Sequence, residues 1–395
     1  MDKRTVRDVE VEGKRVLVRV DFNVPLDAKT GRITSDSRIR AALSTIEYLV
    51  KHKAKVILCS HLGRPGGKVV EGLRMRPVAQ RLSKLIGLPV LIVPDCIGAE
   101  VENVVDRLNE GDILVLENLR FHAEEEANDS SFAQSLAKLA DIHVNDAFGV
   151  AHRAHASTVG VSRYLPSVAG LLLEKELKAL GGILSNPGHP FAALLGGAKV
   201  SDKINLIQNI MDKVDLLLIG GGMAATFLKV QGYEVGFSLV ESDKQTLAKQ
   251  LVQTAQQDGV SLHLPLDVMV AESMNTQAVG EIVSIGGIPP DKYIVDIGPR
   301  TIESFCRELV RCRTVFWNGP MGVYEISQFA KGTKAMVEVM ATLKATTIVG
   351  GGSTAEIVED MNMTDKMTHV STGGGASLAF LEGKSLPGVE ALLDK

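Results

Sequence analysis

Cysteine is scarce in this 395-residue chain. The four cysteines, Cys59, Cys96, Cys306 and Cys312, form no Cys-x-x-Cys pair and stand beside no His-rich run. Their spacing therefore predicts neither a metal site nor a disulfide framework. We expect free thiols, buried or partly buried, in a reducing compartment.

Long apolar runs are also lacking, since none reaches the ~18 residues that a membrane helix needs. The N-terminal stretch MDKRTVRDVEVEGKR is charged and has no apolar core of the kind that defines a signal peptide. These absences predict a cytoplasmic protein that makes no use of a membrane.

Neither sign of charge dominates the chain. Lysine and arginine number 43 and the acidic residues 47, a net charge of −4. A nucleic-acid binder usually shows a basic excess over a whole domain, so no nucleic-acid partner is expected. Hydrophobic residues at 45% and charged residues at 23% are ordinary for a globular protein, and the length allows two or three domains.

Short apolar runs alternate with turns and amphipathic helical stretches, which predicts an α/β fold with mostly parallel strands. The runs are continuously apolar, as is typical of strands buried on both faces. In the first half they are Arg15–Val20, Lys55–Cys59, Ile113–Leu116 and Ile142–Val144, and in the second half Phe191–Leu195, Leu216–Ile219, Val315–Trp317, Thr346–Val349 and His369–Ser371.

The loops after these strands differ between the two halves. Those of the first half are polar and basic, whereas those of the second half are glycine clusters, such as residues 196–197, 220–222, 350–352 and 373–375. This contrast predicts two domains that bind two different ligands. We place the join at residues 171–180, a helical stretch with the sequence LLLEKELKAL.

The basic side chains of the first half gather at predicted strand ends, where open α/β sheets bind their ligands. Because arginine forks bind phosphate and carboxylate oxygens bidentately, these residues predict a site for a small polyanion. The alternative for any single one is a solvated surface charge or a structural ion pair. The residues are Arg38, His61, Arg64, Arg120, His152, Arg153 and His155.

The second half predicts a phosphate cradle. Glycine turns at helix starts expose backbone N–H groups to anions. In the segment GGAKVSDKI (Gly196–Ile204), helical apolar spacing predicts that Lys199 and Lys203 share one face at a helix start. A positive charge there is unfavourable without an anion. The alternative is an exposed lysine pair on an amphipathic helix.

Familiar nucleotide-binding and hydrolase motifs are missing. The chain has no G-x-x-x-x-G-K-[ST] loop, which excludes a P-loop kinase, and no early G-x-G-x-x-G followed by an acidic residue, which disfavours a nicotinamide dehydrogenase. No Ser-His-Asp arrangement stands out in a G-x-S-x-G context.

Eight segments, in this order and spread over almost the whole chain, resemble the phosphoglycerate kinase family. They are VRVDFNVP (Val18–Pro25), SHLGRP (Ser60–Pro65), ENLRF (Glu117–Phe121), NDAFGVAHRAHAS (Asn145–Ser157), GGAKVSDKI (Gly196–Ile204), GGGMA (Gly220–Ala224), WNGPMGVYE (Trp317–Glu325) and STGGGAS (Ser371–Ser377).

The resemblance implies two Rossmann-like lobes with parallel sheets joined by a hinge helix. Residues 1–170 would form an N-terminal lobe for 3-phosphoglycerate, 171–180 the hinge helix, and 181–374 a C-terminal lobe for ATP or ADP with Mg²⁺. Residues 375–395 would return to the N-terminal lobe. The implied reaction is the glycolytic one, reversible phosphoryl transfer between 1,3-bisphosphoglycerate and ADP that gives 3-phosphoglycerate and ATP. The family also implies a monomer.

The resemblance also implies a substrate site. Asp21 and Asn23 resemble the residues that hold the hydroxyl and carboxyl end of 3-phosphoglycerate. Arg38, in the catalytic set, resembles the arginine on the reacting carboxyl and the transferred phosphoryl group. The other basic residues resemble binders of the fixed 3-phosphate, with His152 close by. The substrate residues are Asp21, Asn23, Arg38, His61, Leu62, Gly63, Arg64, Arg120, His152 and Arg153.

The nucleotide site is implied in the same way. Lys199 resembles the lysine that stabilises the transferred group, and Lys203 the one on the nucleotide phosphates. Glu325 resembles the carboxylate on the ribose hydroxyls. Gly351 and Gly374 come from the two glycine turns that flank the phosphates and join the catalytic set. The nucleotide residues are Gly197, Lys203, Gly220, Gly221, Asn318, Gly322, Glu325, Gly351, Gly352, Ser353 and Thr354.

One position departs from the family pattern. Ser353 stands where the family commonly has an aspartate associated with the metal-nucleotide complex. Serine supplies no carboxylate, so we expect no metal ligand from the protein and Mg²⁺ held by nucleotide oxygens and water, as it often is. The requirement for Mg²⁺ should be intact.

The implied chemistry needs in-line positioning and charge stabilisation. The nucleophile, a carboxylate or phosphate oxygen, is already ionised, so no general base is required. Ligands on separate lobes call for domain closure. Two alternatives stay open: a NAD-dependent dehydrogenase, and a regulatory protein that has kept the fold and lost catalysis. The second alternative predicts that Arg38, Lys199 or the glycine turns have been replaced. All of these residues are retained in this chain.

Overall fold

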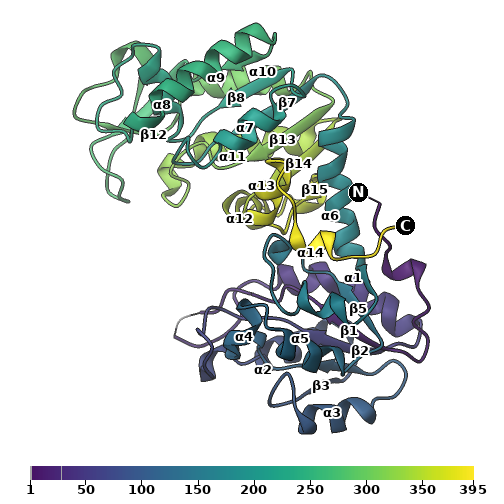
Figure 1. Cartoon of the computed structure of the whole chain (residues 1–395). Coiled ribbons are helices and arrows are strands. Elements are labelled where there is room, and N and C mark those ends of the chain that lie inside the picture. The colour runs from purple at the N-terminus through teal and green to yellow at the C-terminus, as the bar shows by residue number, and fades with distance from the viewer. Residues whose placement is uncertain (1, 28) are drawn as a thin grey trace. The chain divides into compact units, whose positions relative to one another are not determined.

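The computed structural model describes residues 2–27 and 29–395 and divides the chain into two compact units (Figure 1). The first unit contains the residues up to Lys178 together with Ser385–Lys395, and the second contains Ala179–Lys384. Each unit is built on a six-stranded sheet with only parallel pairings, which confirms the predicted fold class.

The C-terminal boundary differs from the predicted one. We expected residues 375–395 to return to the first lobe, but residues 375–384 belong to the second unit. The reason is a contact within that unit, where helix α13 (Gly375–Leu381) packs against α7 (Ile204–Ile210). The remaining residues include α14 (Pro387–Glu390) and lie in the first unit, where Asn145 Nδ2 donates to the Gly388 carbonyl at 2.8 Å.

The first sheet has the strand order β3-β4-β2-β1-β5-β6. Its strands alternate apolar side chains between two cores, so that Val16 and Val18 pack with helices on one face and Leu17 on the other. The strands are β1 (Arg15–Arg19), β2 (Lys55–Cys59), β3 (Val90–Ile92), β4 (Ile113–Val115), β5 (Ile142–Asn145) and β6 (Ser167–Ala169). The helices are α1 (Ser37–Lys51), α2 (Arg76–Ile86), α3 (Ala99–Asp106), α4 (Ala123–Glu126) and α5 (Ser130–Ala137).

The second sheet has the order β15-β14-β13-β7-β8-β9. Its strands are β7 (Phe191–Leu195), β8 (Leu216–Ile219), β9 (Ser261–His263), β13 (Thr314–Asn318), β14 (Thr346–Gly350) and β15 (His369–Val370). With α7 and α13, its helices are α8 (Ala224–Val230), α9 (Gln245–Gln257), α10 (Pro299–Leu309), α11 (Lys331–Thr342) and α12 (Gly352–Asp360). The chain winds from β7 outward in one direction and then resumes at β13 on the other side, so β7 and β13 flank a topological switch point, where such sheets bind ligands.

A small antiparallel sheet in the second unit was not predicted. It has the order β11-β10-β12, formed by β10 (Asp267–Ala271), β11 (Glu281–Ser284) and β12 (Tyr293–Ile297). The hinge prediction at residues 171–180 falls within a longer helix, α6 (Leu171–Ser185), which contains the boundary between the two units. In the described part of the chain, no helix combines the length and the apolarity needed to cross a membrane.

The start of α6 is held by Asp146, a buried carboxyl that the sequence did not single out. Asp146 Oδ1 accepts from the backbone N–H groups of Leu172 and Leu173 at 2.9 and 3.1 Å. The side chain is completely buried, and burial raises its pKa to about 7 despite these hydrogen bonds. Its second oxygen has no hydrogen-bond partner among the described residues, so the protonated acid fits the site better than the carboxylate.

The raised pKa of Asp146 predicts a pH-dependent stability difference for Asp146→Asn. An unfolded aspartate loses its proton near pH 4, whereas Asp146 in the folded chain keeps it up to about pH 7. The folded state binds more protons between these values, so the wild-type free energy of unfolding falls as pH rises through this window. Relative to wild type, the variant should gain about 2–4 kcal/mol between pH 4 and pH 8.

Urea unfolding at a series of pH values measures this difference. Asp129→Asn is the matched control, because Asp129 also caps a helix through one oxygen, with Ser131 and Phe132 as donors, but is only partly buried. A difference between wild type and Asp146→Asn that stays constant with pH would show that Asp146 is ionised in the folded state.

Candidate active site

Asp21 and Arg38 form an ion pair at the carboxyl end of the first sheet. Asp21 follows β1, Arg38 lies in the first turn of α1, and Arg38 Nη1 contacts Asp21 Oδ2. Burial alone would raise the pKa of Asp21, but Arg38 and Arg19 outweigh it and hold the pKa below its ordinary value. The carboxylate is therefore ionised, and it aligns an arginine whose side chain is 36% exposed and free to reach a ligand.

The loops after β1, β2 and β4 are tied together by three predicted residues. Asn23 Oδ1 accepts from the Gly63 N–H at 2.8 Å, and the Gly63 carbonyl accepts from Arg120 Nη1 at 3.0 Å. Gly63 has φ +64° and a Cβ there would lie 2.8 Å from the Leu73 side chain, so glycine is required. Gly63 and Arg120 lie 40 and 97 positions after Asn23 in the chain, and these contacts bring all three residues into one site.

Arg120 is the most informative residue of the site. It is 3% exposed, yet its Nε and Nη2 atoms are buried without a hydrogen-bond partner among the described residues. The nearest acid, Glu126, lies 3.2 Å from Nε. Burial lowers its pKa, and Arg153 and Arg19 add repulsion. A buried guanidinium with unused donors is costly unless a ligand pairs with it, so the geometry favours a bound anion.

His61 is neutral and has a defined tautomer. It is buried, which lowers its pKa well below the ordinary value. Arg19 Nη2 lies 3.1 Å from His61 Nδ1, and because arginine can only donate, Nδ1 is the acceptor and Nε2 carries the proton. Asp21 Oδ1 lies 3.9 Å from Nδ1. The ring thus keeps one N–H donor for a ligand.

Arg19 is a site residue that sequence reasoning missed. Its side chain is completely buried and also donates to Ser157 Oγ at 2.8 Å, and Ser157 in turn hydrogen-bonds to the buried Glu125. Arg19 is the last residue of the buried strand β1, and in the sequence it stands within an apolar run. A charge inside such a run is the one signal that marks it, because buried charges need partners.

The loop after β5 adds further cationic and neutral donors. Arg153 Nε donates to His152 Nε2 at 3.2 Å, while His152 Nδ1 is buried without a partner among the described residues. Burial and nearby arginines lower the pKa of His155 to about 4, and burial and Arg153 lower the pKa of His152. Both rings are therefore neutral beside the arginines.

Two of the predicted substrate residues differ from the rest in burial. Arg64 is exposed and projects from the loop, whereas Leu62 is 1% exposed and acts through its backbone. The Leu62 N–H donates to Asn118 Oδ1 at 3.2 Å, and Asn118 Nδ2 donates to the Leu62 carbonyl at 2.8 Å. Asn118, which sequence reasoning did not assign, also accepts from the Arg120 N–H and so fixes the Arg120 backbone.

In the second unit, glycine turns meet at the switch point between β7 and β13. The Gly196 N–H donates to the Asn318 carbonyl at 2.9 Å, and the Gly197 N–H donates to the Pro320 carbonyl at 2.9 Å. Gly319 has φ +94°, and a Cβ there would lie 2.3 Å from the Gly196 carbonyl oxygen. The two turns pack backbone to backbone, which only glycine allows.

The lysine prediction is partly wrong. We expected Lys199 and Lys203 on one face at a helix start, but helix α7 begins at Ile204 and Lys203 is its N-cap residue. Residues 201–203 form a turn, so Lys199 is exposed while Lys203 is 8% exposed. Helical spacing of the apolar residues extended the predicted helix too far toward its N-terminus.

The Lys203 side chain instead contacts the end of β13 at the switch point. Its Nζ donates to Asn318 Oδ1, and Asn318 Nδ2 is buried without a partner among the described residues. Burial lowers the pKa of Lys203. A buried ammonium group and an unused amide donor beside glycine turns are suited to a phosphate.

The turn before α12 closes on the same asparagine. Gly351 has φ +90° and is the N-cap of α12, and a Cβ there would lie 2.9 Å from Asn318 Nδ2. Thr354 is buried, and its Oγ1 accepts from the Gly319 N–H at 2.8 Å, so its side chain is structural. Gly352 and Ser353 are exposed in the first turn of α12.

The remaining predicted nucleotide residues lie in neighbouring turns. Gly220 and Gly221 follow β8, and Gly374 is the N-cap of α13. Gly322 leaves no room for a Cβ, which would lie 2.4 Å from Asp296 Oδ1, and Glu325 is exposed. The structure thus brings Gly197, Lys203, Gly221, Asn318 and Gly351 together, while it gives no contact that joins Glu325 to them.

Comparison with known proteins decides what this pair of sites belongs to. The model of the family described as phosphoglycerate kinase matches residues 6–384. The chain belongs to the phosphoglycerate kinase family. Its phosphoglycerate kinase relatives include that of Moorella thermoacetica, 56% identical over 395 residues, and that of Pelotomaculum thermopropionicum, 55% identical over 395 residues, each aligned over 100% of both chains.

Solved phosphoglycerate kinase structures share the fold. The structure from Coxiella burnetii is 41% identical with a TM-score of 0.87, and that from Pyrococcus horikoshii is 33% identical with a TM-score of 0.86. Each alignment covers 98% of both chains. The resemblance seen in the eight sequence segments is thereby confirmed over the whole chain, and the dehydrogenase alternative falls away.

Proposed function

We propose that this chain catalyses reversible phosphoryl transfer between 1,3-bisphosphoglycerate and ADP, giving 3-phosphoglycerate and ATP. Membership of the phosphoglycerate kinase family supports the reaction. The observation that carries it at the level of the site is the buried, partly unpaired Arg120, which calls for an anionic ligand in the first unit. The chain acts in the cytoplasm as a monomer.

The first unit binds 3-phosphoglycerate. Arg120, Arg153 and Arg64 hold its fixed 3-phosphate, to which the neutral His61 donates from Nε2. Asn23 and Asp21 hold the hydroxyl and carboxyl end. Because charge-assisted hydrogen bonds to phosphate are stronger than neutral ones, the arginines supply most of the affinity. Arg38 is aligned by Asp21 and contacts the reacting carboxyl and the transferred group.

The second unit binds ATP or ADP. Lys203 and the Asn318 amide lie against the nucleotide phosphates together with the glycine turns at Gly197 and Gly351, and the exposed Lys199 reaches the transferred phosphoryl group. Gly220, Gly221 and Gly322 line the adenosine side, with Glu325 on the ribose hydroxyls. Helix α12 directs its N-terminus, with the N–H groups of Gly352 and Ser353, at the phosphates.

Catalysis follows from positioning and charge stabilisation. The transferred group spreads negative charge over three oxygens, which Arg38, Lys199 and the N–H groups near Gly351 and Gly374 neutralise. The attacking carboxylate or phosphate oxygen is already ionised, so no side chain has to remove a proton. The two ligands must meet in a water-free space, and closure of the two units supplies it.

Mg²⁺ fits this site as part of the nucleotide complex. Ser353 is exposed and would offer the ion a hydroxyl oxygen but no carboxylate, so most of its ligands would have to come from the nucleotide and from water. When bound, Mg²⁺ neutralises phosphate charge.

We expect chelation of Mg²⁺ to abolish turnover and Ser353→Asp to lower the Mg²⁺ concentration at half-maximal rate by a few-fold. A rate that survives complete chelation would contradict the first expectation. An Mg²⁺ dependence that is the same in Ser353→Asp as in wild type would contradict the second.

A coupled assay tests the function directly. Purified chain, 3-phosphoglycerate and MgATP are mixed, and 1,3-bisphosphoglycerate is followed through its NADH-dependent reduction. Turnover that requires both substrates supports the proposal. If each substrate binds in calorimetry but no turnover occurs, the chain is the binding or regulatory protein that the sequence left open.

A further inference from the structure

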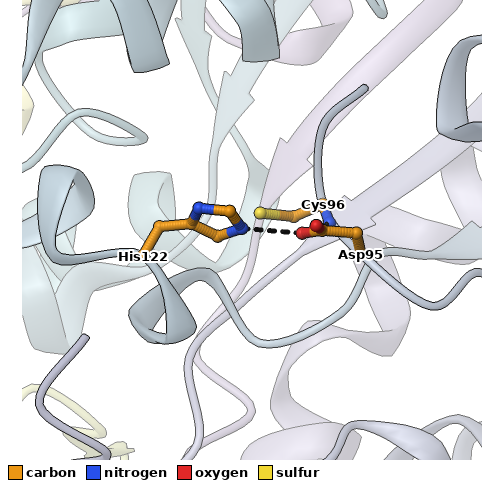
Figure 2. A group of neighbouring side chains, drawn as sticks. All are labelled: Asp95, Cys96 and His122. Atoms are coloured by element: carbon orange, nitrogen blue, oxygen red, sulfur yellow. Dashed lines mark hydrogen bonds and ion pairs between the residues drawn. The ribbon is translucent and has the colours of Figure 1, made fainter. Parts of the chain in front are cut away.

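A second group of reactive side chains lies in the first unit and takes no part in the proposed chemistry. Asp95 and Cys96 follow β3, and His122 follows the loop after β4 (Figure 2). A carboxylate oxygen, the thiol sulfur and a ring nitrogen of these residues all lie within 4.8 Å of one another. Among the described residues this is the one such group of three or more possible metal ligands.

The ligand types identify the class of ion. Thiolate, imidazole and carboxylate together suit Zn²⁺ and its close relatives, whereas Mg²⁺ and Ca²⁺ prefer oxygen alone. We propose that Asp95, Cys96 and His122 bind a Zn²⁺-class divalent cation, with a water molecule in the fourth position. Three protein ligands and one open position is the arrangement of an exchangeable site rather than a closed structural one.

The three side chains already converge. His122 Nε2 lies 2.7 Å from Asp95 Oδ1, and Figure 2 shows the Cys96 sulfur directed toward the His122 ring. The cation takes the place of the proton shared between the imidazole and the carboxylate. Ligation through Nε2 leaves any ring proton on Nδ1, and the Cys96 thiol releases its proton to solvent. The bonds formed are those of the cation to the carboxylate oxygen, the sulfur, the ring nitrogen and one water molecule.

Surrounding contacts hold the ligands in place without a cation. The Asp95 carbonyl accepts from the Glu117 N–H at 3.3 Å, which ties the loop after β3 to the loop after β4. The Cys96 N–H donates to Asp95 Oδ1 at 2.7 Å. The His122 ring packs against Phe132 with ring centroids 5.2 Å apart. Little conformational freedom is lost on binding, which favours affinity.

Charge and access are also consistent with a cation. Carboxylate and thiolate together balance the two charges of the ion. Cys96 is completely buried, but the side chains of Asp95 and His122 are 50% and 26% exposed, so the ion enters across them from solvent.

Co²⁺ titration of the untagged, metal-free full-length chain tests the site. Thiolate ligation produces a sulfur-to-cobalt charge-transfer band in the near ultraviolet, and Zn²⁺ should displace Co²⁺ and remove the band. We expect Asp95→Asn and His122→Gln to weaken Co²⁺ binding by at least about 100-fold, since even outer-shell partners typically contribute ~10–100-fold. Cys96→Ser should abolish the band.

Cys306→Ser is the matched control, because Cys306 is a partly buried free thiol of the second unit. It should bind Co²⁺ like wild type. Asp95→Asn and His122→Gln change side chains that are only partly buried, so they keep the test decisive even if Cys96→Ser fails to fold. The proposal is overturned if wild type gives no charge-transfer band at saturating Co²⁺, or if the band persists in folded Asp95→Asn and His122→Gln with wild-type affinity.

Discussion

Arg38→Ala should lower kcat by about 10³-fold and leave the dissociation constant of MgATP almost unchanged. Loss of one charge-stabilising group at a transferring phosphoryl group typically has an effect of this size. Arg38 belongs to the first unit, and the proposed nucleotide residues belong to the second, so the two effects separate. Steady-state kinetics and calorimetry with MgATP measure the two quantities.

Arg40→Ala is the control for this variant. Arg40 lies on the same helix and also pairs with an aspartate, Asp36 at 2.8 Å, but its side chain is 55% exposed and lies outside the proposed site. It should turn over at close to the wild-type rate. Near-normal kcat in Arg38→Ala would remove Arg38 from the catalytic set. A rate lowered equally in both variants would indicate damage to α1 instead.

Lys203→Met should weaken MgATP binding by roughly 10–100-fold, the factor expected for hydrogen bonds to a charged group. Methionine keeps most of the volume of the buried lysine but removes the ammonium group, and it leaves Asn318 Oδ1 without its donor. Binding of 3-phosphoglycerate, which we assign to the other unit, should not change. Calorimetry with each ligand separately measures both expectations.

Lys213→Met provides the comparison within the same unit. Lys213 pairs with Asp212 at 2.7 Å, is partly buried and has no part in the proposed nucleotide site. Its affinity for MgATP should equal that of wild type. Unchanged MgATP affinity in Lys203→Met would mean that the buried lysine serves the packing of the switch point rather than the nucleotide.

The strands could be predicted closely because their signal is local. Lys55–Cys59, Phe191–Leu195 and Leu216–Ile219 are strands with the expected bounds. A strand buried on both faces is a continuous apolar run in any sequence, whatever lies around it. The antiparallel strand β11 was missed because it is largely exposed and carries no such run. Strands β10 and β12 are buried and were missed although an apolar run marks each of them, interrupted in β12 by Asp296.

Helix starts were harder to predict than strands. The apolar spacing around Val200 and Ile204 continues through residues that form a turn, so periodicity placed the start of α7 too early. The turn is decided by tertiary contacts: the Lys203 side chain is drawn to Asn318, and the Ser201 N–H donates to Glu241. Local propensity is a weak prior that such contacts override.

Taken alone, the sequence determined the fold class, the two kinds of loop and the family, because apolar runs, glycine clusters and ordered motifs are properties of neighbouring residues. Only the tertiary structure decided which groups are buried and what they contact. It paired Arg19 with His61, left donors of Arg120 unpaired, and brought Asp95 and Cys96 to His122. These contacts are between residues far apart in the chain. Burial and hydrogen bonding depend on which residues the fold brings together, and the local spacing of residues in the sequence does not reveal this.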